Sequence, residues 1–136
     1  MQKIVSLSPR PKGIHLVTDE LLSMGELSTV RVGLLHLHLL HTSAGLCLNE
    51  NASPEVRVDL ELWFEEAVPF TGRYQHSEEG FDDMPAHIKT ILTGSSLTIP
   101  ISDGKPMLGP WQGIYLCEFR LSAGSRNCVL TIAGSD

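Results

Sequence analysis

Three histidines lie in polar stretches of the chain, and each has carboxylates near it in the sequence. Glu50 lies beyond His41, Glu78 and Glu79 follow His76, and Asp82 and Asp83 precede His87. Neutral imidazoles combined with a carboxylate are suitable ligands for Zn²⁺ or a similar divalent ion. No local spacing such as HExxH forces the three rings together, so acid–base catalysis by the same side chains is the alternative. We therefore predict His41, His76 and His87 as metal ligands or as catalytic groups.

His87 also has a favourable position within its predicted helix. The segment DDMPAHIKTILTG is typical of a helix that begins at Asp82 or Asp83, has Pro85 in its first turn and ends at Gly94. The positive end of the helix dipole disfavours an imidazolium in the first turn. His87 is therefore expected to stay neutral and available as a ligand or a base.

Two further pairs could complete such a site. Glu118 and Arg120 share one face of a predicted strand over 113–121, so an acid and a base project the same way; a cross-strand salt bridge is the alternative. Ser95 and Ser96 follow Gly94 at a helix end, where small polar groups can hold an anion. An ordinary helix exit is the simpler explanation of these two serines.

The stretch from His41 to Glu66 is positioned by two elements. An apolar strand predicted over 30–40 delivers the chain to His41, and its apolar character on nearly every position predicts burial on both faces. Residues 45–48 are expected to pair with it after a turn at Thr42 and Ser43. Ser53 and Pro54 then begin a helix that ends at Pro69, with a buried stripe formed by Val56, Leu60, Trp63, Phe64 and Ala67.

The remaining elements define the fold class. Strands are predicted over 4–7, 14–17, 95–101 and 128–133, with a hairpin turn over 102–105. A short helix is expected from Thr18, as its N-cap, to Gly25. Many strands with two or three helices clustered mid-chain indicate an α+β fold and not alternating βαβ units. With 136 residues and no linker, we expect a single domain spanning 1–136.

Composition narrows the classes of function. The formal net charge is −6 and Lys and Arg do not cluster, which disfavours binding to nucleic acid. Three cysteines without a CxxC pair favour a reducing compartment. The longest apolar run is too short to cross a bilayer, and the first residues lack the core of a signal peptide. We expect a cytoplasmic protein that does not bind membranes.

The motifs themselves resemble a known family. The segments HTSAGLCLNENASPEVRVDLE, over 41–61, and YQHSEEGFDDMPAHIKTILTGSSLTIPISDGKPMLGPWQGIYLCEFR, over 74–120, are similar to the YjbQ-like family, described as secondary thiamine-phosphate synthases. The combination of HTSA, NEN, DDMPAHIK, GSSLTIP and WQGIYL-x-E is specific, and the likeness extends from about residue 33 to 121.

The resemblance implies an α+β domain with helices packed on a mixed, sandwich-like sheet, usually assembled as a homotrimer. It implies a pocket close to a subunit boundary that takes a small, phosphorylated substrate and a divalent metal such as Zn²⁺, Mn²⁺ or Mg²⁺. Carried over by motif position, the catalytic residues would be His41, His76, His87, Glu118 and Arg120. The substrate-binding residues would be Thr42, Ser43, Asn49, Glu50, Asn51, Asp83, Ser95, Ser96 and Gln112.

The activity implied by the resemblance joins a pyrimidine diphosphate to a thiazole phosphate and releases pyrophosphate. The charge of the leaving diphosphate must be neutralised by a metal ion or by cationic side chains. The candidate cations are few: Arg73, Lys89, Lys105 and Arg120. A weak or side synthase activity is therefore expected, and two alternatives stay open: a metal-dependent hydrolase of a small metabolite, or a non-catalytic trimer that binds a metabolite or metal.

Overall fold

The computed structural model describes residues 1–23 and 25–136. Its elements follow in the order β1 (Gln2–Leu7), β2 (Gly13–Leu16), α1 (Thr18–Leu22), the 3₁₀ helix η1 (Gly25–Thr29), β3 (Val32–Leu39), β4 (Ala44–Glu50), α2 (Pro54–Ala67), α3 (Asp83–Thr93), β5 (Ser96–Ser102), β6 (Lys105–Pro106), β7 (Gln112–Glu118) and β8 (Arg126–Ser135).

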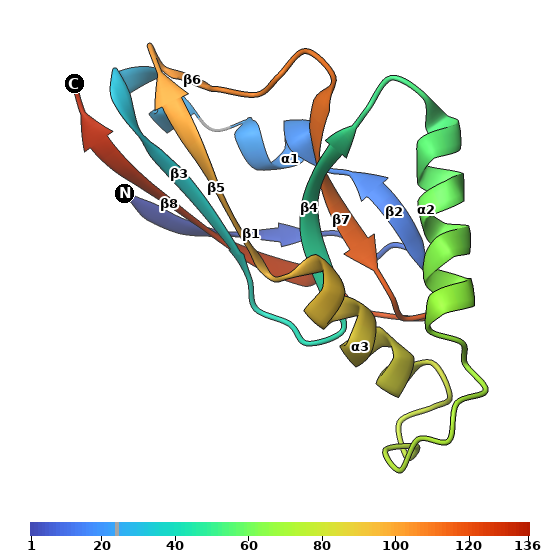
Figure 1. The fold of residues 1–136 in the computed structure, drawn as a ribbon. Helices are drawn as coiled ribbons and strands as arrows, with labels where there is room; N and C mark the ends of the chain where they lie inside the picture. The colour runs from blue at the N-terminus through green and yellow to red at the C-terminus, as the bar shows by residue number, and fades with distance from the viewer. Residues whose placement is uncertain (24) are drawn as a thin grey trace.

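The strands form two sheets, one of five strands in the order β1-β8-β3-β5-β6 and one of three in the order β2-β7-β4. The predicted α+β class is confirmed, with α2 and α3 on one side of the smaller sheet and α1 beside the core between the two sheets (Figure 1). Every strand pair among the described residues is antiparallel, so the sheet is not mixed as the resemblance implied.

Two apolar clusters hold three layers together. The larger one lies between the two sheets and includes Leu35, Leu37, Leu46 and Leu116, all fully buried. The smaller one lies between the three-stranded sheet and the helices α2 and α3, around Tyr115. Since β7 contributes to both clusters, its alternating side chains are buried on both faces.

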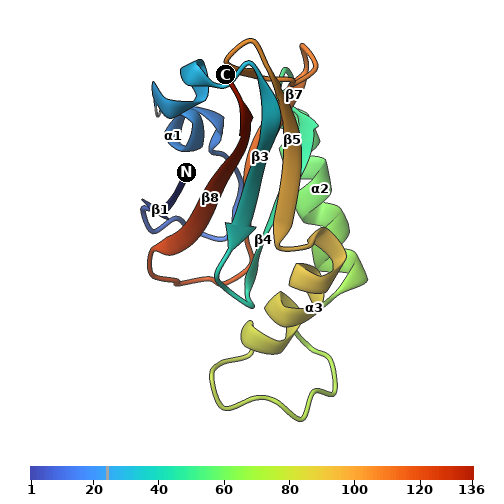
Figure 2. The ribbon, with the colours of Figure 1, turned by 90° about the vertical axis from the view of Figure 1, so that its left-hand side faces the viewer.

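Strand β3 is buried on one face only, and not on both faces as predicted. Leu35, Leu37 and Leu39 face the core, whereas Leu34 is 50% exposed and His38 also faces outward. Figure 2 shows that no helix crosses in front of β8, β3 and β5 on this side. The apolar residues do form a strand, but no described part of the chain covers its second face.

Strand β4 also pairs differently from the prediction. It lies in the smaller sheet beside β7, with Ala44 opposite Glu118 and Glu50 opposite Gln112, and not beside β3. The turn at Thr42 and Ser43 therefore carries the chain from one sheet to the other. Which strand β4 pairs with depends on residues far apart in the chain, and the local turn residues do not specify it.

The helices begin close to their predicted starts. α1 ends at Leu22, before the expected stop at Gly25, and Thr18 is its first residue, not its cap: the Thr18 hydroxyl accepts a hydrogen bond from the Ile114 N–H. Helix α2 has no fully buried residue, and Trp63 of its predicted stripe is 56% exposed. α3 ends as predicted at Gly94, whose φ of 87° suits glycine.

Candidate functional site

The first turns of α3 and the loop before it bring two histidines to one carboxylate. The Nε2 atom of His76 lies 2.7 Å from Asp83 Oδ2, and Nε2 of His87 lies 3.0 Å from the same oxygen. Asp83 and His87 are four residues apart on α3, which places them on one helix face. These three residues are the one group of metal-ligand type found in the described residues, with ligand atoms within 4.8 Å of one another.

The hydrogen bonds of His87 define its tautomer. Its Nδ1 lies 2.8 Å from the carbonyl oxygen of Thr42, and a carbonyl can only accept, so Nδ1 carries a proton. In the neutral ring, the Nε2 lone pair then points at Asp83 Oδ2, and two acceptors at 3.0 Å require a proton or a cation between them. A metal-binding histidine usually donates its other nitrogen to a carbonyl in this way.

Arg120 fixes the carboxylates at the start of α3. Its Nε donates to Asp82 Oδ2 at 2.9 Å, Nη1 to Asp83 Oδ1 at 2.7 Å and Nη2 to the carbonyl of Glu79 at 2.8 Å. Burial alone would raise the pKa of Asp82, but hydrogen bonds from the Leu121 N–H and Arg120 outweigh it and lower the pKa. The Asp82 side chain accepts a hydrogen bond from Arg120 and does not cap the helix, as had been expected.

Asp83 is held ionised by the same neighbourhood. It is 1% exposed, and burial alone would raise its pKa. The hydrogen bond from His76, the adjacent His87 ring and the charge of Arg120 more than offset burial, so the pKa falls below the ordinary aspartate value. An ionised carboxylate with one oxygen on Arg120 and the other facing two imidazoles is suited to accept a cation.

His41 does not belong to this group. Its Nε2 accepts a hydrogen bond from the Asn127 N–H at 2.7 Å, so its ring binds the start of β8. Burial, followed by the charge of Arg126, lowers the pKa of His41. The predicted three-histidine set is thus brought together only in part: His76 and His87 meet at Asp83, and His41 lies next to Thr42, which binds His87.

The lowered pKa of His41 predicts an acid-dependent loss of stability. A group whose folded pKa lies below its unfolded value of 6.5 contributes stability that is present above pH 6.5 and is lost as the pH falls through the folded pKa. Protonation would also place an N–H opposite the Asn127 N–H. A histidine NMR titration should give His41 a pKa below 6.5; a value at or above 6.5 would contradict this assignment.

The side chains of Glu118 and Arg120, predicted to act together, bind different charged partners, although the Arg120 N–H donates to Glu118 Oε2 at 3.1 Å. Glu118 is 1% exposed and forms two short contacts with Arg126, of 2.7 Å to Nε and 2.6 Å to Nη2. Arg126 Nη2 also donates to the Ser43 hydroxyl at 3.0 Å. Strand β7 ends at Glu118, so Arg120 leaves the face that the alternation assigned to it. Glu118 supports the chain around Ser43 through Arg126.

The NEN motif lies at the other end of the β4–β7 pair. Asn49 accepts from the Glu50 N–H at 2.7 Å, and Asn51 donates to the Gln112 carbonyl at 3.4 Å. Gln112 accepts from the Gly109 N–H through its side chain. Because Ala44 lies at the His87 end of β4 and Glu50 at the other, roughly 20 Å of strand separates the two groups. One chain therefore does not gather all the predicted residues in one pocket.

The predicted serines have structural contacts of their own. The Ser96 hydroxyl lies 2.6 Å from His38 Nδ1 on the outer face of the larger sheet, and the Ser95 carbonyl accepts from the Leu39 N–H. Thr42 contributes its backbone carbonyl to His87, while its side chain is exposed. An anion site at Ser95 and Ser96 remains a prediction.

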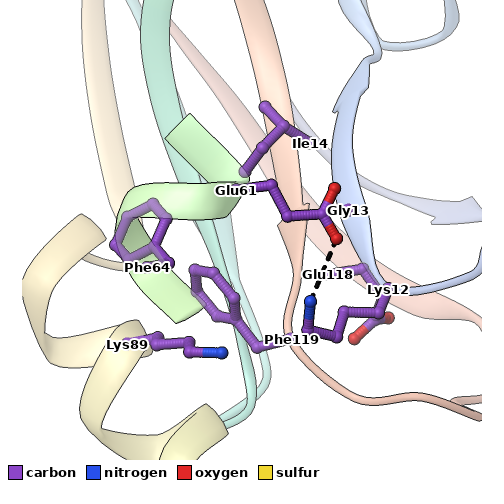
Figure 3. A pocket seen from close by; sticks show the side chains of 8 residues that line it. All are labelled: Lys12, Gly13, Ile14, Glu61, Phe64, Lys89, Glu118 and Phe119. Atoms are coloured by element: carbon purple, nitrogen blue, oxygen red, sulfur yellow. Dashed lines mark hydrogen bonds and ion pairs between the residues drawn. The ribbon is translucent and has the colours of Figure 1, made fainter. Parts of the chain in front are cut away.

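A small pocket lies between α2, α3 and β7, and Lys89 points into it (Figure 3). Lys89 is fully buried and has no hydrogen-bond partner among the described residues; its Nζ lies 4.0 Å from a Glu65 oxygen and 5.8 Å from the centre of the Phe119 ring. Burial lowers the pKa of Lys89. Lys12, on the other side, pairs with Glu61 and Glu65. The pocket thus has balanced charge and apolar walls.

Two supporting residues were missed by sequence reasoning. Arg126 follows a glycine–serine turn and carries no recognisable motif, although it is the buried partner of Glu118. Asp82 was taken as a helix cap, and its role in binding Arg120 depends on the distant end of β7. The spacing of Asp83 and His87 was the one local signal that could have identified the shared carboxylate.

Comparisons with known proteins agree on one family. A family model described as "UPF0047 protein YjbQ-like" matches residues 3–135. The chain is 49% identical over 134 residues to "UPF0047 protein YjbQ" of Escherichia coli O157:H7, covering 98% of this chain and 97% of the relative. It is 40% identical over 134 residues to a UPF0047 protein of Synechocystis, covering 98% and 91%.

Solved structures give the same result for the fold. An uncharacterised yjbq/upf0047 family protein of Clostridium acetobutylicum is 32% identical, with a TM-score of 0.80 over 98% of this chain and 99% of that one. A YbjQ-like protein of unknown function from Sulfolobus solfataricus has a TM-score of 0.88 at 20% identity, covering 99% and 97%. At that identity the likeness concerns the fold alone. Among the described residues, no helix is long and apolar enough to cross a membrane.

Proposed function

Because this chain belongs to the UPF0047 YjbQ-like family, we propose that its His76–Asp83–His87 cluster binds a divalent metal ion at which a small phosphorylated molecule reacts. The observation that carries the proposal is the contact between His87 Nε2 and Asp83 Oδ2, two acceptors 3.0 Å apart. Two imidazoles and one carboxylate are a known ligand set of catalytic Zn²⁺, and Mn²⁺ or Mg²⁺ are the alternatives.

The neighbouring residues would have defined tasks. Thr42 holds His87 in the tautomer that exposes Nε2, and Arg120 orients the Asp83 carboxylate. A bound divalent ion would polarise a phosphoryl oxygen and neutralise developing negative charge. The lowered pKa of His41 keeps its ring neutral, and His41 directly precedes Thr42 in the sequence. Among the predicted catalytic residues, it is therefore the candidate for moving a proton.

The first candidate reaction is the one that the family resemblance implies, the joining of a pyrimidine diphosphate to a thiazole phosphate with release of pyrophosphate. It requires cationic groups for the diphosphate. Arg120, expected to provide one, already donates from Nε, Nη1 and Nη2 to protein oxygens. This engagement favours a second candidate, metal-dependent hydrolysis of a small phosphorylated metabolite, which needs fewer cations.

A substrate panel tests both reactions. Purified protein loaded with Zn²⁺, Mn²⁺ or Mg²⁺ would be assayed for pyrophosphate released from the two synthase substrates together, and for phosphate released from single phosphorylated metabolites. Release that needs both organic substrates supports the synthase, and release from one supports the hydrolase. His76→Ala and His87→Ala should abolish either activity while the protein stays folded. Turnover that survives both replacements, or that is equal in EDTA, would place the chemistry elsewhere.

The predicted homotrimer is part of this proposal. Ile4 and Leu34 are 62% and 50% exposed on two strands of the five-stranded sheet, and a second copy would cover such apolar side chains. Size-exclusion chromatography with light scattering should give three times the mass of one chain. Leu34→Lys should shift the protein to monomer, whereas Ile91→Lys on α3, an apolar position that is 83% exposed, is the control. A monomeric wild type would refute the trimer.

The expected compartment belongs to the same proposal. Cys47, Cys117 and Cys128 are free thiols, which supports a reducing environment such as the cytoplasm. Cell fractionation would test it, and recovery of the protein outside the cytoplasm would refute it.

A further inference from the structure

Arg57 on α2 differs from the other arginines that are partly or fully buried. The others bind carboxylates: Arg10 binds Glu20, Arg120 binds Asp82 and Asp83, and Arg126 binds Glu118. Within the described part of the chain Arg57 forms no ion pair, and its buried Nε has no hydrogen-bond partner. Leaving a buried donor unpaired costs about 1–3 kcal/mol or more, so this position points to an acceptor supplied by a ligand.

The guanidinium is placed by an aromatic ring. Its central carbon lies 5.5 Å from the centre of the Tyr115 ring. The Tyr115 hydroxyl donates to the Glu50 carbonyl at 2.8 Å, which fixes the ring on the side of the small sheet that faces α2. Stacking on a held ring limits the motion of a long side chain, so the donors of Arg57 are presented in a defined direction.

Amide side chains lie on the same side of the sheet. Asn49 is directly opposite Gly113 in the β4–β7 ladder, two residues from Tyr115. A Cβ atom built on Gly113 would lie 3.1 Å from the Asn51 Cβ, so the Asn51 side chain covers this glycine. Asn49 uses its oxygen to accept from the Glu50 N–H, which leaves its NH₂ group for another acceptor. Asn49 thus shares the Tyr115 face of the sheet, on which the Arg57 guanidinium packs, and the Asn51 amide, which also donates to the Gln112 carbonyl at 3.4 Å, follows at the end of β4.

We propose that Arg57, with Asn49 and Asn51, forms an oxyanion site that binds the phosphate group of a small molecule. The guanidinium fork matches two phosphate oxygens, and amide N–H groups supply further donors. Glu50 does not compete for Arg57, because it lies opposite Gln112 on the other face and accepts from the Ser53 N–H. The site is separated from the His76–Asp83–His87 cluster by the length of β4 and does not depend on a metal there.

The test uses the full-length protein in EDTA, with inorganic phosphate as the probe and the Arg57 Nε–H signal followed by NMR. We expect saturable binding by the wild type and at least about tenfold weaker binding by Arg57→Gln, which removes charge-assisted hydrogen bonds. Arg57→Lys should be intermediate, since it keeps the charge and loses the fork. Arg31→Gln, which replaces an exposed arginine, is the matched control and should bind as the wild type does.

Three outcomes would overturn the proposal: no phosphate binding by the wild type, unchanged binding by Arg57→Gln, or acetate binding as tightly as phosphate. Thermal unfolding of Arg57→Gln shows whether the variant is folded, and Arg57→Lys provides a second reading if it is not. Asp83→Asn should keep its phosphate affinity. Failure of metal binding at the histidines would therefore leave this result intact, and the two proposals can fail separately.

Discussion

Asp83→Asn is expected to weaken divalent-ion binding by at least about 100-fold. Replacing a residue that only orients a metal ligand lowers metal affinity by about 10–100-fold, and Asp83 would contact the ion itself. The replacement keeps the size of the side chain and removes the charge that His76 and His87 share. Calorimetric titration of EDTA-treated protein with Zn²⁺, Mn²⁺ and Mg²⁺ measures the effect. A bound ion should also raise the Tm of the wild type and leave that of the variant unchanged.

Glu78→Gln is the matched control for this replacement. Glu78 is an exposed carboxylate in the loop that carries His76, outside the group of ligand atoms. It should leave the affinity within about twofold of the wild type, as expected for an exposed charge screened by solvent. Equal affinities of Asp83→Asn and the wild type would mean that the cluster does not hold the ion, and would leave the two imidazoles with an acid–base role at Asp83.

Arg126→Met should be the most destabilising single replacement of a charged residue. It leaves the Glu118 carboxylate, 1% exposed, without its partner, and breaking one side of a buried ion pair costs about 3–5 kcal/mol. For a chain of this size the Tm should fall by roughly 10–20 °C. Differential scanning calorimetry measures it, with Lys3→Met as control because the Lys3–Glu26 pair is exposed.

A double variant separates the ion pair from simple loss of packing. Replacing Glu118 by Leu together with Arg126→Met removes both charges, so much of the lost stability should return. If Arg126→Met alone lowers the Tm no more than Lys3→Met, the pair is not desolvated as the structure indicates. If the double variant is less stable than either single one, packing and not charge is the dominant contribution.

Local signals in the sequence were sufficient for α3 and for the hairpin that follows β5. Pro85 and Gly94 delimit the helix, and Asp103 and Gly104 adopt the positive φ values of 50° and 77° that a tight turn requires. The family motifs also placed His76, Asp83 and His87 among the predicted site residues, and their side chains do lie together. The i, i+4 spacing makes the contact between Asp83 and His87 readable without a structure.

Other features depend on residues far apart in the chain. The apolar residues of β3 predict a strand but do not say that only one of its faces meets the core. The placement of β4 beside β7 separates Asn49 from His87, although both stand in motifs attributed to one pocket. Arg120 and Glu118 are two residues apart, yet one binds α3 and the other β8, because β7 ends between them.

The central position of β8 has a consequence for how the chain acquires its fold. This strand follows all the other described strands in the sequence, and it lies between β1 and β3, with Cys128 opposite Val5 on one side and Leu39 on the other (Figure 1). Until it leaves the ribosome, the larger sheet lacks the strand that joins its first and middle members, and the Glu118 carboxylate lacks Arg126. Folding of the larger sheet must therefore wait for residues 126–135, and such distant strand pairings make it slow.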